Sequence, residues 1–486
     1  MLDRPGSAPF VPLAAAIVAL AGAGPASAPA RAQDALPPLS DAARERINAM
    51  LAEVSAQRLQ ADVERLASFG TRHTLSTVDA VDRGVGAARQ WAHDEFLKAS
   101  FAAQRTGENR MEVMLDRHMQ PADGRRITRD AEIINVVAFI PGAMPEARPR
   151  LYYAVAHLDT RAPDANDAES DAPGANDNAS GTAALLELAR VMAKQKFDAT
   201  IVLMATTGEE QGLYGAKLHA QQLKSLGGDV RAVLNNDTVG DPYGRFDPRS
   251  DEGAWARTRV RVFAEGLPVH AHRATPEELR RIAQTGAEND SPARALARYV
   301  LDVAQAHDLP VQPMMIYRND RFLRGGDHTA FLEAGFPAAV RLTVPYEDYT
   351  RQHENVRVEN DTPYGDVPSY IDADYLAGVT RLNLATLAHL ANAPSAPADV
   401  RIIVASLDND TTLRWTPSPE PDVAGYEVVR RETTSPVWQF VHPVPGGAQA
   451  TEVVLPFTKD NWLFGVRAVD RDGFRSPAVF PVPARE

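Results

Sequence analysis

The sequence predicts an α/β fold, a three-layer α/β/α sandwich around a mostly parallel mixed sheet, followed by a small C-terminal all-β sandwich. Two observations lead to this prediction. Between residues 130 and 393, apolar strand-like segments alternate with helical segments, which is typical of a mostly parallel sheet covered by helices. Residues 398–486 instead contain short alternating segments separated by turns, which is the pattern of an all-β sandwich.

The composition is that of a globular protein, and it limits the kinds of site that the chain can carry. A length of 486 residues suggests two to three domains, and a hydrophobic fraction of 44% is enough for a large core. The formal net charge of -13 argues against a nucleic-acid partner, because phosphate binding needs clustered Lys and Arg. Because the chain has no cysteine, any metal site must use histidines and carboxylates.

The N-terminus predicts a secretory signal peptide over residues 1–32. Arg4 precedes an apolar run over residues 10–23, and Ala30-Arg31-Ala32 fits a small-residue cleavage site. A membrane anchor is the alternative, but the run is shorter than the roughly 20 residues that cross a bilayer. We therefore expect a secreted or periplasmic protein with no stable membrane span in the mature chain. Export without cysteine favours a bacterial source.

Residues 33–64 predict an N-terminal helical segment, and residues 65–393 predict the α/β domain. In the first segment, apolar residues recur at three- and four-residue spacing, and Ser55 can cap a second helix. Residues 242–292 are a polar insertion that could rim a pocket. The expected helices of the domain are 84–98, 179–193, 211–226, 293–307 and 373–391, and the expected strands are 133–140, 151–156, 200–205, 230–234 and 338–342.

Residues 394–397 form a linker by composition, and residues 398–486 form the predicted β-sandwich. This part resembles a fibronectin type III module in Trp415-Thr416-Pro417-Ser418 and in Gly425-Tyr426-Glu427-Val428, although Trp462 stands where that family usually has a tyrosine. We expect it to serve in binding, or to be removed in maturation. Its expected strands are 400–405, 412–415, 425–430, 451–455 and 462–469.

Acidic and imidazole groups follow three successive strands of the predicted sheet. His157 follows the strand 151–156, Glu209-Glu210 follows 200–205, and Asp237 follows 230–234. The carboxyl ends of parallel strands meet at one edge of the sheet, which is where ligands bind in such folds. Asp177 lies just before a helix and His353 in a loop after the strand 338–342. These two residues are further candidates for the same edge.

Two histidines and several carboxylates suit zinc, which accepts nitrogen and oxygen ligands. Two ions would share a bridging carboxylate, and the loop of Asp177 can reach both. His157 and Asp237 would then complete one ion, and Glu210 and His353 the other. Each residue alone has an ordinary structural explanation, such as a helix N-cap for Asp177, but their joint occurrence at the strand ends predicts a metal site.

The remaining carboxylates near these positions have different expected tasks. Neighbouring residues that leave a strand point in different directions, so Glu210 can bind a metal while Glu209 stays free. A free carboxylate beside a metal-bound water acts as a general base. Asp159, two residues after His157, is placed to accept the other imidazole N–H and to fix the tautomer.

The chain resembles the M28 family of zinc peptidases, which includes bacterial secreted leucyl-type aminopeptidases. The resemblance covers residues 65–393, and its motifs occur in the family's order. It implies a zinc-exopeptidase fold and peptide substrates with a free N-terminus. It also implies two Zn²⁺ ions on His157, Asp177, Glu210, Asp237 and His353, Glu209 as base, and a non-proline cis peptide after Asp177. The matching segments are Ala156-His157-Leu158-Asp159-Thr160, Pro173-Gly174-Ala175-Asn176-Asp177-Asn178-Ala179-Ser180-Gly181, Gly208-Glu209-Glu210, Asn236-Asp237 and Gly326-Asp327-His328.

The last metal ligand departs from the family pattern. Its usual place is a Tyr-His-Thr-like run, and this chain has Tyr349-Thr350-Arg351-Gln352-His353 instead. We expect His353 to bind the metal, with His328 as the rival. In the family, the segment of His328 is usually near the site without binding the metal. Tyr349 could help to polarise the substrate carbonyl.

The residues predict a secreted dinuclear zinc enzyme, the resemblance implies that it is an aminopeptidase, and three alternatives stay open. A glutaminyl cyclase of the same superfamily would use a similar sheet with one zinc ion. A carboxypeptidase would need a cation for the terminal carboxylate of its substrate, and Arg324 or Arg351 could serve. A non-catalytic binding protein of this fold would normally have lost ligands or the base, and here none is missing.

Overall fold

The computed structural model describes residues 36–105, 111–268, 274–406 and 408–485, so the predicted signal peptide lies outside the described residues. The N-terminal part forms three helices, α1 (Asp41–Glu53), α2 (Ala56–Ala67) and α3 (Gly84–Arg105). Ser55 caps α2 as predicted, because its hydroxyl accepts a hydrogen bond from the backbone N–H of Arg58. Across the described ranges, no helix is both long and apolar enough to span a bilayer.

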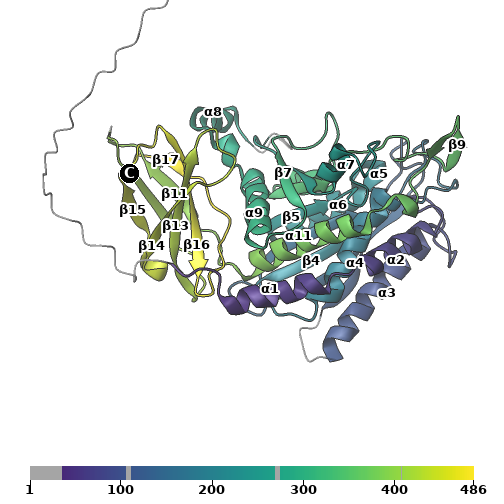
Figure 1. Ribbon diagram of the computed structural model, residues 1–486, viewed down its shortest axis with the longest axis horizontal. Coiled ribbons are helices and arrows are strands. Elements are labelled where there is room, and N and C mark those ends of the chain that lie inside the picture. Colours follow the sequence, from purple (N-terminus) through teal and green to yellow (C-terminus); the bar gives the residue numbers. More distant parts are fainter. Residues whose placement is uncertain (1–35, 106–110, 269–273, 407, 486) are drawn as a thin grey trace, which may run out of the picture. The chain divides into compact units, whose positions relative to one another are not determined.

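An eight-stranded mixed sheet forms the centre of the large domain (Figure 1). Its strand order is β1-β2-β4-β3-β5-β8-β6-β7. The neighbours β4, β3, β5 and β8 are parallel, whereas β1, β2 and the β8–β6 pair are joined in antiparallel fashion. This arrangement confirms the predicted fold class. The strands are β1 (Glu112–Gln120), β2 (Ala131–Ile140), β3 (Arg150–His157), β4 (Thr200–Thr206), β5 (Asp229–Asn236), β6 (Arg259–Phe263), β7 (Gln312–Ile316) and β8 (Ala339–Thr343).

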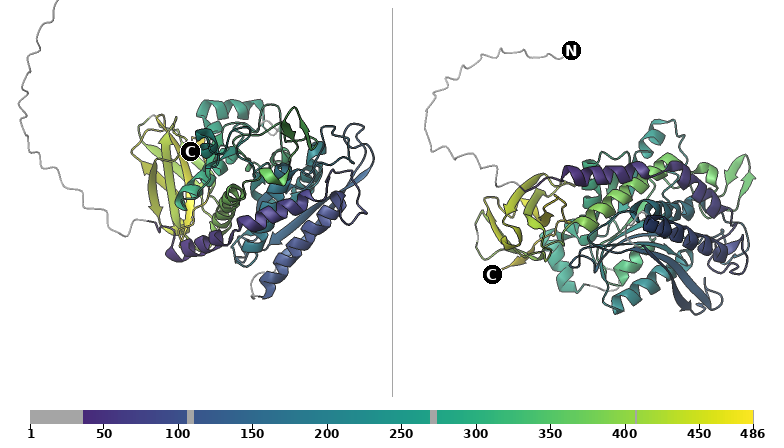
Figure 2. Two further views of the ribbon diagram at one scale, coloured as in Figure 1. Left: turned by 45° about the vertical axis from the view of Figure 1, so that its right-hand side comes forward. Right: turned by 90° about the horizontal axis from the view of Figure 1, so that it is seen from below.

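Helices cover both faces of this sheet (Figures 1 and 2). Successive strand residues point to opposite faces, so Val136 of β2 packs in one core and Val137 in the other. The first core also contains helices α4 (Ser180–Met192), α9 (Pro292–Ala306) and α11 (Ala373–Asn392). The second core contains α6 (Tyr214–Ser225) and α10 (Asp327–Glu333).

The prediction that residues 242–292 are a polar insertion is partly wrong, because this segment contains a strand of the central sheet. Strand β6 lies between β8 and β7, flanked in sequence by α7 (Asp251–Ala256) and α8 (Pro276–Thr285). Arg259 and Arg261 gave this segment a polar composition. Yet the side chain of Arg261 is only partly exposed. Its guanidinium forms an ion pair with the buried carboxylate of Glu347, at 2.9 Å. Strands β1 and β7 were also not predicted.

The C-terminal part forms two small sheets, in the orders β15-β12-β11-β17 and β14-β13-β16. Trp415, Tyr426, Phe464 and Val466 are buried in the core between them, and Trp462 is partly buried against it. The likeness to a fibronectin type III module stays a prediction, and β17 pairs in parallel with β11. The strands are β11 (Ala398–Ile403), β12 (Thr411–Thr416), β13 (Val423–Glu432), β14 (Phe440–Pro445), β15 (Glu452–Leu455), β16 (Trp462–Asp470) and β17 (Val482–Ala484).

Buried polar contacts join this C-terminal part to the large domain. The carboxylate of Asp290 forms ion pairs with Arg298 of α9 and with Arg431 of β13, each at 2.7 Å. All three side chains are buried. The predicted linker is packed as well, since the hydroxyl of Ser395 donates to Glu420 at 2.6 Å. The composition of residues 394–397 therefore indicates where one kind of fold ends and the next begins. It does not indicate a flexible linker.

Candidate metal centre

The parallel strands β4, β3 and β5 deliver the predicted residues to one edge of the sheet. His157 is the last residue of β3, Asp237 follows β5, and Glu209 and Glu210 begin the short helix α5 (Glu209–Gly212) just after β4. The pairing of β3 with both neighbours keeps these ends level with one another. The three strands that carry the candidate ligands are therefore adjacent, as the sequence predicted.

Asp177 occupies the middle of the cluster. Its Oδ1 lies 3.1 Å from His157 Nε2, and its Oδ2 lies 3.0 Å from His353 Nε2. His353 Nε2 is also 2.9 Å from Glu210 Oε1, and His157 Nε2 is 3.6 Å from Asp237 Oδ1. One carboxylate thus contacts both imidazoles, each of which has a further carboxylate of its own. The Asp177–Asn178 peptide bond is cis, as the resemblance implied.

These donors fit zinc. Two groups, His157 with Glu209 and Asp237, and His157 with Asp177 and Glu210, each place one ligand atom per residue within 4.8 Å of the others. Tetrahedral zinc with ligand distances of about 2.0 Å needs donor atoms about 3.3 Å apart. The separations of 2.9–3.6 Å in the cluster are close to that requirement. The donors are imidazole nitrogens and carboxylate oxygens, which zinc accepts.

Electrostatics also favour a cation at this position. Burial would lower the pKa of His353, but Glu210 and Asp177 raise it to about 10. The pKa of His157 is raised well above its usual range for the same reason, by Glu209, Asp177 and Asp237 against the effect of burial. The carboxylates thus attract positive charge, part of which comes from Arg341, 3.1 Å from Asp237 Oδ2, and from Arg161, 3.8 Å from Glu210 Oε2. A metal ion between the imidazoles and carboxylates would supply further positive charge.

Glu209 lies in this cluster and is partly buried. Its removal from water, together with the negative charges of Asp237, Glu210 and Asp327, raises the pKa of Glu209 well above its usual range. A carboxylate whose proton affinity has been raised in this way is suited to accept a proton. Glu210 is in contact with His353, whereas Glu209 lies near His157 and Asp237, and the division of tasks between the two glutamates stays a prediction.

The comparison with known proteins assigns the chain to a family. The model of peptidase family M28 matches residues 135–386. A probable zinc metalloprotease of Pyrenophora teres f. teres is 45% identical over 440 residues, which are 90% of this chain and 87% of that one. The chain belongs to peptidase family M28. A probable zinc metalloprotease of Leptosphaeria maculans is also 45% identical, over 91% of this chain and 98% of its own length.

This M28 chain is thus a zinc metalloprotease. These sequence relatives are fungal, so they do not support the expected likeness to bacterial enzymes in particular. Among solved structures, the LapA aminopeptidase of Legionella pneumophila matches with a TM-score of 0.48 and 19% identity, over 72% of this chain and 75% of that one. A glutaminyl cyclase of Porphyromonas gingivalis matches with a TM-score of 0.45 and 17% identity, over 69% and 98%.

Asp159 lies beside the metal cluster. We expected its carboxylate to accept a hydrogen bond from His157, and this prediction is wrong. The partner of His157 Nδ1 is the main-chain oxygen of Asp159 at 3.0 Å, whereas the carboxylate is 3.9 Å away. The carboxylate accepts instead from the backbone N–H groups of Glu209 and Glu210, at 3.3 and 3.2 Å. Asp159 therefore positions the two glutamates, because the start of α5 offers N–H groups that need an acceptor.

His328, the rival to His353, and Tyr349, the candidate for polarising the substrate carbonyl, have other partners. His328 is buried and its Nε2 lies 3.0 Å from the main-chain oxygen of Asn319. Tyr349 is 60% exposed, and its hydroxyl donates to Glu347 at 2.9 Å. His353 is the histidine that contacts Asp177 and Glu210, which supports its choice over His328.

Three further residues support the cluster, and none of them was predicted. Arg72 is fully buried and donates to the main-chain oxygens of Leu158, Pro173 and Gly174, so it joins the loops of His157 and Asp177. Asp366 accepts the backbone N–H groups of Asn176 and Asp177, at 2.7–2.9 Å. Arg341 of β8 places Nη2 3.1 Å from Asp237 Oδ2. Arg72 belongs to Gly70-Thr71-Arg72-His73, a segment that also resembles the sequence of the family.

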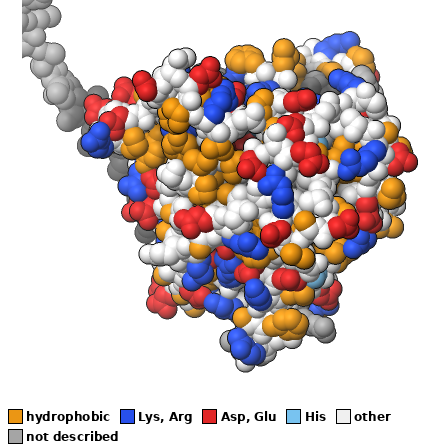
Figure 3. All heavy atoms as spheres, turned by 90° about the vertical axis from the view of Figure 1, so that its right-hand side faces the viewer, with side chains coloured by type: hydrophobic (Ala, Val, Ile, Leu, Met, Phe, Trp, Pro, Cys, Tyr) orange, Lys and Arg blue, Asp and Glu red, His pale blue; other side chains and the backbone are white. Residues whose placement is uncertain are grey.

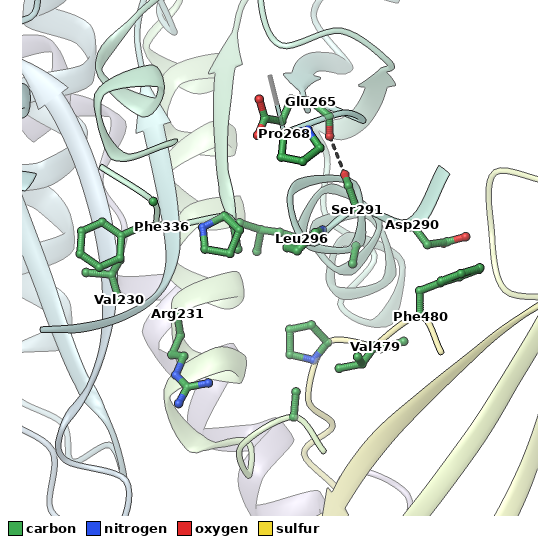
Figure 4. Close-up of a pocket in the computed structure, with 18 of the residues that line it drawn as sticks. Val230, Arg231, Glu265, Pro268, Asp290, Ser291, Leu296, Phe336, Val479 and Phe480 are labelled. Carbon is green, nitrogen blue, oxygen red and sulfur yellow. Dashed lines mark hydrogen bonds between the residues drawn. The ribbon is translucent and has the colours of Figure 1, made fainter. Parts of the chain in front are cut away.

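A cavity of about 570 Å³ lies elsewhere, beside the C-terminal part (Figure 4). Its lining includes Arg150, Val230 and Ala338 from the amino ends of β3, β5 and β8, together with Val479 and Phe480. The candidate ligands lie at the carboxyl ends of these strands, so the cavity is separate from the metal cluster. Figure 3 shows a face of the molecule on which acidic and basic side chains are interspersed.

Proposed function

We propose that this M28 peptidase is a dinuclear zinc aminopeptidase that removes N-terminal residues from peptides. The observation that carries this proposal is the position of Asp177 between two imidazoles, beside a small acidic cavity. The first part of the observation supports two metal ions. The second supports a substrate with a free amino group.

The support for two ions comes from the two sides of Asp177. Its Oδ1 faces His157, which has Asp237 as a further neighbour, and its Oδ2 faces His353, which has Glu210. A bridging carboxylate with a histidine and a carboxylate on each side is the donor arrangement of a two-metal hydrolase. A one-zinc cyclase would have no need of the second set.

The chain's own residues then account for hydrolysis. Zinc, when bound, polarises the scissile carbonyl and lowers the pKa of a water molecule at the site. Glu209 accepts the proton of the attacking water and later donates it to the leaving amine. Asp159 holds the backbone of Glu209 and Glu210 in place during both proton transfers. Four residues of the cluster are buried and Glu209 is partly buried, which limits the access of bulk water to the reacting groups; the four are His157, Asp177, Glu210 and Asp237.

The small cavity supports cleavage at a free N-terminus. It has a volume of about 10 Å³, which is room for one water-sized group, and it lies beside Asp177. Its charged lining consists of five carboxylates and one arginine, namely Asp177, Asp241, Glu347, Asp348, Asp366 and Arg351. A primary ammonium group has the right size and charge for this position. A substrate carboxylate would be repelled, which argues against a carboxypeptidase.

The test is the Glu209→Ala variant of the zinc-loaded protein, assayed with aminoacyl and N-acetylated aminoacyl substrates. We expect wild type to cleave the free-amino substrates much faster than the N-acetylated ones, and the variant to lose about 10²–10⁴-fold in kcat while keeping its zinc. Glu277→Ala, in an exposed turn of α8, is the control and should behave as wild type. Full activity of Glu209→Ala would refute the mechanism. A metal content of one zinc per chain would favour a cyclase instead.

We further propose that the enzyme is exported, into the periplasm or the medium, after removal of residues 1–32. The support is the charged, apolar and small-residue pattern of that segment. For the C-terminal β part we propose a structural role within the enzyme. The buried contacts of Asp290 with Arg298 and Arg431 support this role better than they support release during maturation.

A further inference from the structure

Gln352 directly precedes the candidate ligand His353, and its amide contacts the centre of the metal cluster. Gln352 Nε2 donates to Asp177 Oδ2 at 2.6 Å. The opposite orientation of the amide would bring its oxygen against a carboxylate oxygen at the same distance, which electrostatic repulsion excludes. The nitrogen of this amide is therefore assigned to Asp177, and the oxygen is left for another partner.

That other partner is missing from the part of the chain that the structure describes. Gln352 Oε1 is buried, and no described residue donates a hydrogen bond to it. A buried carbonyl oxygen without a donor costs free energy, and most such oxygens in folded proteins are satisfied. An unmet acceptor beside a catalytic cluster therefore points to a donor that arrives with the substrate.

The surroundings of Gln352 define the chemistry of that donor. Gln352 lines the same small cavity as Asp177, Asp241, Asp348 and Asp366. The only cation in that lining, Arg351, is already paired with Asp241 and lies 3.3 Å from Asp348 and over the ring of Tyr370. Glu347, which also lines the cavity, is paired with Arg261 and Arg321, but the four aspartates still outnumber the one arginine of the lining. A donor that also carries a positive charge, such as a primary ammonium group, satisfies both requirements.

We propose that Gln352 recognises the α-ammonium group of the substrate through Oε1 while Nε2 stays on Asp177. The proposal rests on the proposed aminopeptidase function and names a residue that sets its specificity. Because one amide connects the ammonium group to the bridging carboxylate, a substrate without an N–H donor leaves Oε1 unpaired. Such a substrate is rejected by an unpaired buried acceptor rather than by a clash.

The test compares Gln352→Met with wild type on a matched pair of substrates. Leucine p-nitroanilide carries the ammonium group, and 4-methylpentanoyl p-nitroanilide has hydrogen in its place. Methionine keeps the length of the side chain and removes the acceptor. We expect kcat/KM for the amine substrate to fall roughly 10- to 100-fold, the usual loss for a hydrogen bond to a charged group, with little change for the des-amino substrate.

Two controls separate recognition from misfolding. Asn355→Ala, an exposed change in the same loop, should leave both substrates unaffected. Zinc content and the thermal midpoint are measured for every variant, and Gln352→Leu is a second replacement should Gln352→Met not fold. Calorimetric binding of leucine and of 4-methylpentanoate gives a readout that does not depend on turnover. We expect only the binding of leucine to weaken in the variants.

The outcomes distinguish this inference from the function on which it rests. A loss confined to the amine-bearing compounds supports recognition by Gln352. Equal losses for both compounds, or no loss for either, overturn it while wild type still prefers the amine. If wild type shows no preference for the amine, the aminopeptidase proposal itself fails and the role of Gln352 fails with it.

Discussion

The buried ion pairs of Asp290 with Arg298 and Arg431, between the large domain and the C-terminal part, allow a quantitative prediction. Asp290 offers one carboxylate oxygen to Arg298 and the other to Arg431, both at 2.7 Å, and the arginine side chains are 0% and 2% exposed. Replacing Asp290 by Asn keeps the shape and removes the charge. Two buried guanidinium groups then lie together without a counter-ion.

Breaking a buried ion pair on one side costs about 3–5 kcal/mol, because a charge is left uncompensated. Here the main-chain oxygens of Pro436 and Ser435 still accept hydrogen bonds from the two arginines, at 2.7 and 2.5 Å. We therefore expect the lower end of that range, a loss of about 3 kcal/mol in the free energy of unfolding. Urea titration followed by intrinsic fluorescence measures it, since Trp438 lies over both guanidinium groups.

The control for Asp290→Asn is Glu452→Gln, which removes the charge of an exposed ion pair with Arg414. Both side chains of that pair are about half exposed, at 47% and 50%, so we expect at most about 1 kcal/mol. A loss of less than 1 kcal/mol for Asp290→Asn, or a loss equal to that of the control, would refute the reasoning. The conclusion that the C-terminal part is a fixed element of the enzyme would then lose its main support.

Two further predictions concern pH and processing. Burial, His307 and Arg44 lower the pKa of His389 to about 3, whereas in the unfolded chain this group binds a proton near pH 6.5. The unfolded state thus binds more protons between these values, so the free energy of unfolding should decrease as pH falls below about 6.5. Urea titrations at pH 7 and pH 5 should show a smaller decrease for His389→Gln than for wild type, and an equal decrease would contradict the assignment. N-terminal sequencing of exported protein should begin at Gln33, and an intact Met1 would favour the membrane anchor.

Much of the candidate metal centre was predictable because its residues follow recognisable strands. Apolar runs such as 151–156 and 200–205 mark buried strands, and the first polar residues after them, His157 and Glu209-Glu210, come at the sheet edge where ligands bind. The strand β6 was missed because Arg259 and Arg261 interrupt its apolar pattern, although one of them pairs with a buried glutamate in the fold. A period-two pattern identifies a strand only where its polar residues face water.

The sequence by itself determined the strand-end positions of the candidate ligands, the helix caps such as Ser55 and the change to short strands after residue 397. All of these depend on neighbours within a few residues. Only the tertiary structure decided the roles of Arg72, Asp366, Arg341 and Gln352, because their partners lie on other elements far along the chain. It also showed that the carboxylate of Asp159 accepts hydrogen bonds from the backbone N–H groups of the two glutamates and not from the imidazole of His157. Contacts between residues far apart in the sequence depend on how strands and loops pack in three dimensions. Local sequence periodicity and spacing contain no information about such contacts.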